Sequence, residues 1–472
     1  MKKYFLITIL FATTISFSQN TSSNLVKKIE SVLSDNFFTS TTIALEVYNL
    51  STDRLLYSKN SKLLLHPASN QKILTSLTAL NFLDSAYAFN TEIFYTGNII
   101  DSTLIGDVYV LGGGDPEFTI EDMDSLAQHI KQSGIKSIEG NFYGDVSMFD
   151  SLYWGKGWMW DDNPYAFSPY LSPLIIEKSA CKIFYSPGKI GEPVNIRLYP
   201  ETNFYSLENT SLTINEDTSD FNITRDWIHN KNNIIVDGPL SYKSRSDSVY
   251  RNISEPVKFF LTILKERMSN CGINLTGWCD TLSLPKNSIS IYKTSQPLDT
   301  VLYYMNKNSD NLNAEMVLRA LGNKYFGKRC SADDGIKMID SLIYRLGMKP
   351  KNYSLVDGSG LSFYNLISVE LLTSAMKYTY KEKPDLFRRF YNTLPIAGID
   401  GTLKNRLRSK GVKNNLRAKT GTLSGVSCLS GIVKSKKGND ILFSMMMQNY
   451  TKSSRSARQK QDNICKIIYE EL

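Results

Sequence analysis

The chain of 472 residues has few of the side chains that carry metal or triad chemistry. It contains three histidines, His66, His129 and His229, and no two of them have the H-x-x-x-H spacing of a zinc-binding helix. No C-x-x-C pair is present either. A zinc site or a Ser-His-Asp triad would have to be assembled from this small supply, so the sequence argues against both. We expect no metal and no other cofactor.

Cysteine is scarce as well, with six residues at positions 181, 271, 279, 330, 428 and 465. An even number permits disulfides in an exported protein, and Cys271 with Cys279 is the expected local pair. The other four read equally well as small buried apolar residues.

Long apolar runs are absent after the first residues of the chain. No later segment approaches the ~20 apolar residues needed to cross a bilayer. The start of the chain has a positively charged beginning, the apolar run Tyr4–Phe17 and small residues before Gln19, as in a secretory signal. We therefore expect residues 1–18 to be a signal peptide that is cleaved near Ser18-Gln19. Because no cysteine lies near this point, we expect no lipid and no stable membrane anchor.

Basic residues only slightly outnumber acidic ones: the formal net charge is +8, or +6 without Lys2 and Lys3. An excess this small for the length favours solubility and weak attraction to an anionic polymer. It does not indicate nucleic-acid binding, and no nucleic-acid partner is expected.

Three short motifs lie far apart in the chain: S-x-x-K at Ser69–Lys72, S-D-N at Ser309–Asn311 and K-T-G at Lys419–Gly421. The first is weak alone, because Ser133 and Lys136 have the same spacing with no chemistry implied. The K-T-G tripeptide occurs once, and its place after S-D-N makes an accident improbable.

These residue types suit nucleophilic catalysis. Ser69 would attack a carbonyl carbon, and Lys72, one helical turn away, would take the hydroxyl proton if its amine is kept deprotonated. Ser309 would relay a proton toward the leaving amine, while Asn311 would orient the substrate amide and Lys72. The ordinary alternative is a buried helix whose first turn is capped by Ser69.

The third motif would supply binding groups. The backbone N–H groups of Ser69 and Thr422 would form an oxyanion hole. Lys419, with the hydroxyls of Thr420 and Thr422, would hold a substrate carboxylate, which favours peptides with a free C-terminus. The alternative for Lys419 is a solvated surface cation, since residues 404–417 are basic.

The stretch between Lys72 and Ser309 is too long for a connection within one domain, so it predicts an insertion. Residues 121–133 and 256–269 each read as a helix followed by a short strand, and residues 181–237 between them have the alternation of a small β-rich domain. The triple glycine within Gly112–Pro116 predicts a tight turn, since no Gly-Lys-Ser/Thr follows it.

Strand patterns occur at both ends of the chain, which predicts one sheet built from both ends with Lys419 on its edge. The predicted strands are 42–48, 55–58, 416–422, 426–433 and 441–448. Helical patterns cover 297–326, 333–346 and 369–380, and a last helix is expected over 453–472.

Together with five further segments, the motifs resemble those of the low-molecular-mass class C penicillin-binding proteins, the type 4 D-alanyl-D-alanine carboxypeptidase/endopeptidases. The segments are Pro67–Lys72, Gly112–Pro116, Gly157–Asp162, Asp357–Ser362 and Leu394–Leu403, so the resemblance covers nearly the whole expected mature chain.

This resemblance implies a multidomain α/β protein. A transpeptidase/β-lactamase-like α/β domain with an antiparallel sheet would be interrupted by two nested inserted domains. The expected boundaries are 19–90 with 290–472 for the catalytic domain, 91–180 with 240–289 for the inserted domain, and 181–239 for the nested β-rich domain.

The resemblance also implies a function. A periplasmic serine D,D-peptidase would remove the terminal D-Ala from peptidoglycan stem peptides, and in many family members also cleave cross-bridges, through an acyl-enzyme on Ser69. β-Lactams would be covalent inhibitors. The alternatives are a β-lactamase or esterase-like serine hydrolase, which needs fast deacylation, and a non-catalytic peptidoglycan-binding protein.

Three substrate-binding residues follow from the resemblance alone. Asp162, with Phe167 nearby, would bind the amino group of the stem peptide's diamino acid; otherwise Asp162 is a loop carboxylate beside aromatic packing. Family members often carry arginine after the Asp357–Ser362 segment, whereas this chain has Phe363. This departure bears on recognition of diaminopimelate and leaves the acyl chemistry unaffected.

Overall fold

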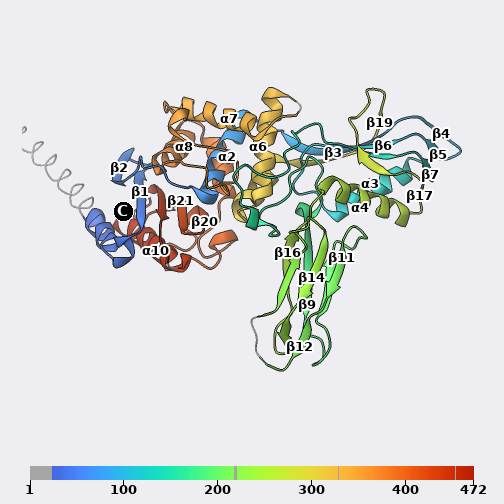
Figure 1. Cartoon of the computed structure of the whole chain (residues 1–472). Helices are drawn as coiled ribbons and strands as arrows, with labels where there is room; N and C mark the ends of the chain where they lie inside the picture. Colours follow the sequence, from blue (N-terminus) through green and yellow to red (C-terminus); the bar gives the residue numbers. More distant parts are fainter. Residues whose placement is uncertain (1–23, 217–219, 328, 452) are drawn as a thin grey trace, which may run out of the picture. The chain divides into compact units, whose positions relative to one another are not determined.

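The structure is a computed structural model that describes residues 24–216, 220–327, 329–451 and 453–472. The predicted signal peptide, residues 1–18, lies outside the described residues. The chain divides into two compact units (Figure 1). The first comprises the described part of Met1–Phe82 with Leu302–Asp310 and Ile336–Leu472; the second comprises Leu83–Val301 and Asn311–Gly335.

The first unit is built on a five-stranded antiparallel sheet of order β2-β1-β22-β21-β20, to which both ends of the chain contribute. Its strands are β1 (Thr42–Asn49), β2 (Arg54–Lys59), β20 (Leu416–Leu423), β21 (Val426–Lys434) and β22 (Asp440–Gln448). All five positions agree with the strand patterns of the sequence. β20 is an edge strand, as predicted from the position of Lys419.

Helices cover this sheet. The helix formed by residues 24–33 lies beside α10 (Ser454–Glu471) (Figure 1). The two helices share a core that includes Leu25, Ile29, Ile464 and Ile468. The other helices of the unit are α2 (Gln71–Phe82), α5 (Leu298–Lys307), α7 (Ala332–Arg345), α8 (Val369–Glu382) and α9 (Pro384–Thr393), with α5 and α7 each starting in the second unit. Short 3-10 turns lie at η1 (Asn36–Thr39), η2 (Ala68–Asn70), η5 (Pro350–Asn352) and η6 (Gly401–Leu403).

The single helical pattern predicted over 297–326 is corrected by the structure, which forms two helices, α5 and α6 (Asn311–Phe326). The break falls on the S-D-N motif, where Ser309 has a positive φ of 61°. A left-handed residue cannot continue a right-handed helix, so the turn places Ser309 between two helix ends.

The second unit contains a pair of similar helix–strand segments, as the sequence had indicated. α3 (Ile120–Gln132) precedes β7 (Ser137–Glu139) and β8 (Phe142–Asp145), and α4 (Pro256–Asn270) precedes β17 (Asn274–Leu275) and β18 (Cys279–Thr281). The copies pair in parallel, β7 with β17 and β8 with β18. The two sheets have the orders β17-β7-β5-β4 and β18-β8-β6-β3-β19. Their remaining strands are β3 (Ala88–Tyr95), β4 (Asn98–Ile100), β5 (Thr103–Ile105), β6 (Val108–Gly112) and β19 (Ile289–Pro297).

Between these segments the chain forms three small sheets, drawn in green in Figure 1: β10-β9-β16, β11-β14-β13 and β12-β15. The strands are β9 (Ala180–Ser186), β10 (Asn195–Tyr199), β11 (Ser206–Asn209), β12 (Leu212–Ile214), β13 (Asn222–Arg225), β14 (Asn233–Asp237), β15 (Pro239–Ser241) and β16 (Asp247–Asn252). Turns η3 (Trp160–Asp162) and η4 (Glu177–Ser179) precede them. The predicted division into three domains stays a prediction.

All six cysteines lie in described residues and are free thiols. The expected pair is not formed, because Cys271 ends α4 and its sulfur accepts a hydrogen bond from Gln128, whereas Cys279 opens β18 opposite Phe142. None of the described helices combines the length and the apolar composition that a membrane span requires.

Candidate active site

Ser69 lies in the η2 turn directly before α2, a buried helix whose residues Gln71–Leu80 are all inaccessible. Ala68 has a positive φ of 45°, so the backbone enters the turn in a conformation that L-residues rarely adopt. Asn70 fixes the turn to the sheet, because its Nδ2 donates to Ser430 Oγ on β21 at 2.6 Å. Ser69 itself keeps partial exposure, as a nucleophile must.

Lys72 Nζ lies 3.1 Å from Ser69 Oγ, within hydrogen-bond distance. The same amine donates to the backbone oxygen of Ser359 at 2.7 Å, and the Lys72 side chain is fully buried. A lysine held at two points has few rotamers left, so the amine stays beside the hydroxyl. Ser69 therefore does more than cap its own helix.

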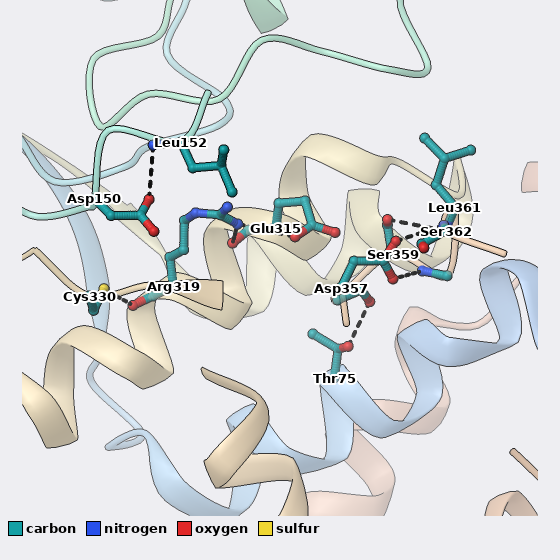
Figure 2. A network of polar contacts seen from close by, with 12 residues as sticks. Thr75, Asp150, Leu152, Glu315, Arg319, Cys330, Asp357, Ser359, Leu361 and Ser362 are labelled. Carbon is teal, nitrogen blue, oxygen red and sulfur yellow. Dashed lines mark hydrogen bonds and ion pairs between the residues drawn. The ribbon is translucent and has the colours of Figure 1, made fainter. Parts of the chain in front are cut away.

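The carbonyl that holds Lys72 belongs to a tight loop at Asp357–Ser362, labelled in Figure 2. Asp357 organises this loop by accepting hydrogen bonds from Gly360 N, Ser362 N and Asn365 Nδ2 at 2.7–2.8 Å. Thr75 on α2 donates to Gly358 O at 2.7 Å. Gly360 has a φ of +78°, and a Cβ there would lie 1.9 Å from Ala68 O, so only glycine permits this approach to the Ser69 turn.

Strand β20 reaches the same turn from the sheet edge. A Cβ on Gly421 would lie 2.9 Å from Pro67 O and 3.1 Å from Ser69 N, so the missing side chain allows the strand to approach the backbone of Ser69 closely. Thr422 follows on an exposed position. The two backbone groups predicted to form an oxyanion hole thus lie on adjoining segments.

Lys419 is fully buried, which rules out the solvated surface cation considered from the sequence. Its Nζ donates to Ser309 Oγ at 2.8 Å and to Thr420 O at 3.0 Å. Burial, followed by the positive charge of Lys72, lowers the pKa of Lys419 well below its ordinary value. The site therefore contains two serine–lysine pairs whose amines repel each other.

A second brace holds these segments in place. Lys307, near the end of α5 and two residues before Ser309, donates to Leu394 O at 2.8 Å and pairs with Asp400 Oδ2 at 2.5 Å. Thr402, in the same Leu394–Leu403 loop, shares a hydrogen bond of 2.8 Å with Thr420 Oγ1. The loop therefore ties the S-D-N turn to β20, and the Thr420 hydroxyl is engaged by the protein.

Asn311 begins α6 and belongs to the second unit. Its Nδ2 donates to the backbone oxygen of Phe167 at 2.6 Å, which brings together two residues that the sequence had singled out separately. The Phe167 ring is about half exposed and stacks on Tyr165. Asp162 accepts a hydrogen bond from Met159 N at 2.9 Å, and burial raises its pKa above the ordinary value.

The loop that carries Phe167 is anchored to the small sheets by Arg225. This buried guanidinium donates to Asn163 Oδ1 at 2.8 Å and to Asn252 Oδ1 at 3.1 Å. Asn252 in turn donates to Ser168 O at 2.8 Å. Residues on both sides of Phe167 are therefore fixed by strands β13 and β16.

Phe363 packs against His66, three residues before Ser69. Its ring meets His66 edge to face with centroids 5.2 Å apart, and His66 is held by a contact of 3.2 Å between Nδ1 and Asn365 O. At the position where the resemblance leads to an arginine, this chain thus has a packed aromatic ring.

The sequence did not reveal several groups that hold the site residues in place, either by accepting a hydrogen bond or by forming an ion pair. Ser359 acts through its carbonyl, which leaves no trace in residue identity, although the paired glycines of the Asp357–Ser362 segment do signal a tight turn. Nothing in the sequence distinguishes Lys307 and Asp400 from other charged residues. In the second unit, Figure 2 also shows the buried ion pair Glu315–Arg319 on α6, four residues after Asn311.

An α/β fold with a serine–lysine pair beside the edge of an antiparallel sheet, and with S-D-N and K-T-G motifs, defines a class of penicillin-recognising serine peptidases and related hydrolases. The chain belongs to the D-Ala-D-Ala carboxypeptidase 3 (S13) family, whose sequence model matches residues 25–470. It is accordingly an enzyme of the D-Ala-D-Ala carboxypeptidase type.

Relatives and solved structures agree over most of the chain. The D-alanyl-D-alanine carboxypeptidase of Actinomadura sp. (strain R39) is 28% identical over 448 residues, which cover 91% of this chain and 82% of that protein. The crystal structure of penicillin binding protein 4 (dacB) from Haemophilus influenzae matches with a TM-score of 0.82 at 25% identity, over 95% and 98% of the two chains. A structure of that protein complexed with a β-lactam matches with a TM-score of 0.77 at 23% identity, over 95% and 99%.

Proposed function

We propose that this enzyme removes the terminal D-Ala from peptidoglycan stem peptides through an acyl-enzyme on Ser69. The observation that carries the proposal is the position of Lys72, whose amine lies 3.1 Å from Ser69 Oγ while the Ser359 carbonyl holds it there. A general base must be within hydrogen-bond reach of the proton that it takes, and this pair meets that condition.

In the first step, Ser69 Oγ attacks the carbonyl carbon of the penultimate D-Ala while its proton passes to Lys72. Repulsion between the buried amines of Lys72 and Lys419 disfavours the state in which both are protonated. We propose that Lys72 is the neutral amine of the pair when Ser69 attacks. The oxygen that becomes negative is stabilised by the backbone N–H groups of Ser69 and Thr422, whose segments adjoin at Gly421.

In the second step, the bond to the terminal D-Ala breaks and its nitrogen takes a proton from Ser309. The hydrogen bond of 2.8 Å from Lys419 to Ser309 supports this relay, because the lysine can restore the proton that the hydroxyl gives up. Water then hydrolyses the ester on Ser69. Asn311 is proposed to orient the substrate amide and Lys72, and Lys419 with Thr422 to attract the terminal carboxylate. The Thr420 hydroxyl donates to Thr402 and is left out of this contact.

Two features bear on which stem peptide is used. Asp162 is proposed to bind the amino group of the diamino acid, with the Phe167 ring beside it. Phe363 replaces the arginine that would meet a substrate carboxylate, so we propose a preference for stem peptides whose third residue has no free carboxylate. The same site would cleave D-Ala cross-bridges between stem peptides.

The relatives support the substrate class and the inhibitor class. The Actinomadura protein is named a D-alanyl-D-alanine carboxypeptidase, and the Haemophilus protein has been crystallised with a β-lactam. We propose that β-lactams acylate Ser69 in this chain too. We place the enzyme in the periplasm after cleavage of residues 1–18.

Release of D-Ala from a synthetic stem pentapeptide ending in D-Ala-D-Ala tests the proposal. The wild-type enzyme should release one D-Ala per peptide, and Ser69→Ala should lower kcat by about three orders of magnitude or more. A Ser69→Ala variant that keeps full activity would overturn the proposal. Comparing the turnover of a β-lactam with its stable capture separates a peptidase from a β-lactamase, since only a β-lactamase deacylates fast.

A further inference from the structure

The second unit contains two adjoining cavities that the proposed chemistry does not use. Their volumes are about 410 and 270 Å³, and both are lined by Val146, Asp150 and Ser151. Together they reach the size of typical ligand sites, which is ~300–1,000 Å³. All lining residues belong to the second unit. They form a continuous groove, which we call the Asp150 groove.

One end of the Asp150 groove offers a flat aromatic wall. Tyr153 and Tyr170 stack with centroids 5.6 Å apart and an interplanar angle of 14°. Tyr170 is fixed, because its hydroxyl accepts from Asn163 Nδ2 at 3.0 Å. Tyr153 is 57% exposed and therefore presents ring surface to an incoming molecule. A flat ring of this kind packs against a ligand that has an apolar face and a polar edge.

The other end is lined by Ser147, Thr281, Ser283 and Arg329. Thr281 and Ser283 carry hydroxyls, and Arg329 carries a guanidinium with several donors. Ser147 Oγ itself is buried and is not among the groups that a ligand would reach. The polar residues at this end are an observation separate from the aromatic wall, and they point to a polar ligand.

The charges of the groove select among ligand classes. Arg329 is accompanied by Asp150 at one end and Glu255 at the other, so the groove lacks the excess of cations that binds a polyanion. Its mixture of hydroxyls, carboxylates and an amide at Asn230 does not suit a lipid chain. A neutral ligand with hydroxyls around its edge and an apolar face fits both ends.

We infer that the Asp150 groove binds a chain of N-acetylated sugars. This inference rests on the proposed function, because the stem peptides of peptidoglycan are carried on such a glycan. The aromatic wall takes the apolar face of one sugar, and Ser283, Asp150 and Arg329 take hydroxyl and acetamido groups of its neighbour. The enzyme thereby recognises glycan-linked peptides in preference to free ones.

The test measures binding of a β-1,4-linked N-acetylglucosamine tetramer to the mature protein by titration calorimetry. We expect saturable binding that Tyr153→Ala weakens about tenfold or more. Tyr344→Ala is the matched control, because Tyr344 is a tyrosine of the first unit that is also largely exposed, at 67%. Ser283→Ala provides a second variant, which should weaken binding without removing the aromatic wall.

Penicillin acylation of Ser69, measured on the same preparations, separates the two proposals. Acylation without tetramer binding, or tetramer binding that Tyr153→Ala and Ser283→Ala leave unchanged, overturns the proposed glycan site and leaves the proposed function in place. Tetramer binding without acylation overturns the proposed function and supports glycan binding in the Asp150 groove. The KM for a glycan-linked peptide should rise in Tyr153→Ala while the KM for the free peptide stays constant.

Discussion

Lys419 shows how a single side chain can combine function with a cost in stability. Its amine is fully buried beside Ser309, and burial with the Lys72 charge depresses its pKa. Between the folded and the ordinary unfolded pKa, the unfolded chain binds more protons than the folded one. Stability therefore rises with pH across this interval and is lowest below the folded pKa.

Replacing Lys419 by Met should remove this pH dependence. From about pH 7 to about pH 9.5, below the ordinary lysine pKa of ~10.4, the free energy of unfolding of the wild type should rise relative to that of Lys419→Met. Denaturant unfolding at both pH values measures the difference. Lys404→Met is the control, because Lys404 is exposed. Parallel pH profiles for wild type and Lys419→Met would contradict the assignment.

Phe363 makes a residue-scale prediction about specificity. Since its ring packs on His66 at the place proposed for carboxylate recognition, Phe363→Arg should shift preference toward stem peptides with a free carboxylate on the third residue. The ratio of kcat/KM for two such peptides should change by about tenfold. An unchanged ratio in a folded variant would remove our interpretation of this position.

At the scale of elements, the site depends on how the end of α5 and the Leu394–Leu403 loop hold Ser309 and Lys419. Lys307 is 4% exposed and paired with Asp400, and burial lowers its pKa. Breaking one partner of such a pair leaves a buried charge, which costs more than an exposed pair contributes. The pair thus acts as a brace for the S-D-N turn.

We expect Asp400→Asn to slow acylation of Ser69 by about tenfold and to destabilise the fold by about 1–3 kcal/mol. Stopped-flow acylation by a fluorescent penicillin, together with thermal unfolding, measures both effects. Arg388→Met is the control, because it removes an exposed pair with Asp385 that should contribute almost nothing. If Asp400→Asn acylates at the wild-type rate, the loop does not position the motif.

The elements also show what the sequence could and could not predict. Strand patterns in the sequence located all five strands of the first sheet, and the spacing of Ser69 and Lys72 located the start of α2 within two residues. The break before Asn311 was missed, because residues 297–326 have helical periodicity throughout and nothing local signals the positive φ of Ser309. The Ser359 carbonyl was missed because any residue supplies one.

In the molecule as a whole, the segment between Lys72 and Ser309 also supports a residue of the S-D-N motif. Asn311 follows the S-D-N turn into α6, and its amide is held by the Phe167 carbonyl. The Phe167 loop is held by Arg225 and Asn252 on strands of the small sheets. Hydrogen bonds through the Phe167 loop thus link strands β13 and β16 of the small sheets to Asn311 of the S-D-N motif.

Arg225→Met should therefore affect acylation although Arg225 lies in a small sheet. The oxygens of Asn163 and Asn252 would lose their donor at a cost of about 1–3 kcal/mol, and Asn311 would lose a fixed acceptor. We expect acylation to slow by about tenfold in Arg225→Met and to recover in part in Arg225→Lys. An unchanged rate in a folded Arg225→Met would show that Asn311 needs no support from the insertion.

Formation of a covalent acyl-enzyme on Ser69 is the step on which the proposed activity depends. Incubation of the mature protein with a labelled penicillin, followed by proteolysis and mass spectrometry, detects this step. We predict one adduct, located on the peptide that contains Ser69, and none in a folded Ser69→Ala variant. A folded wild-type protein that stays unlabelled, or a label on any other residue, would contradict it.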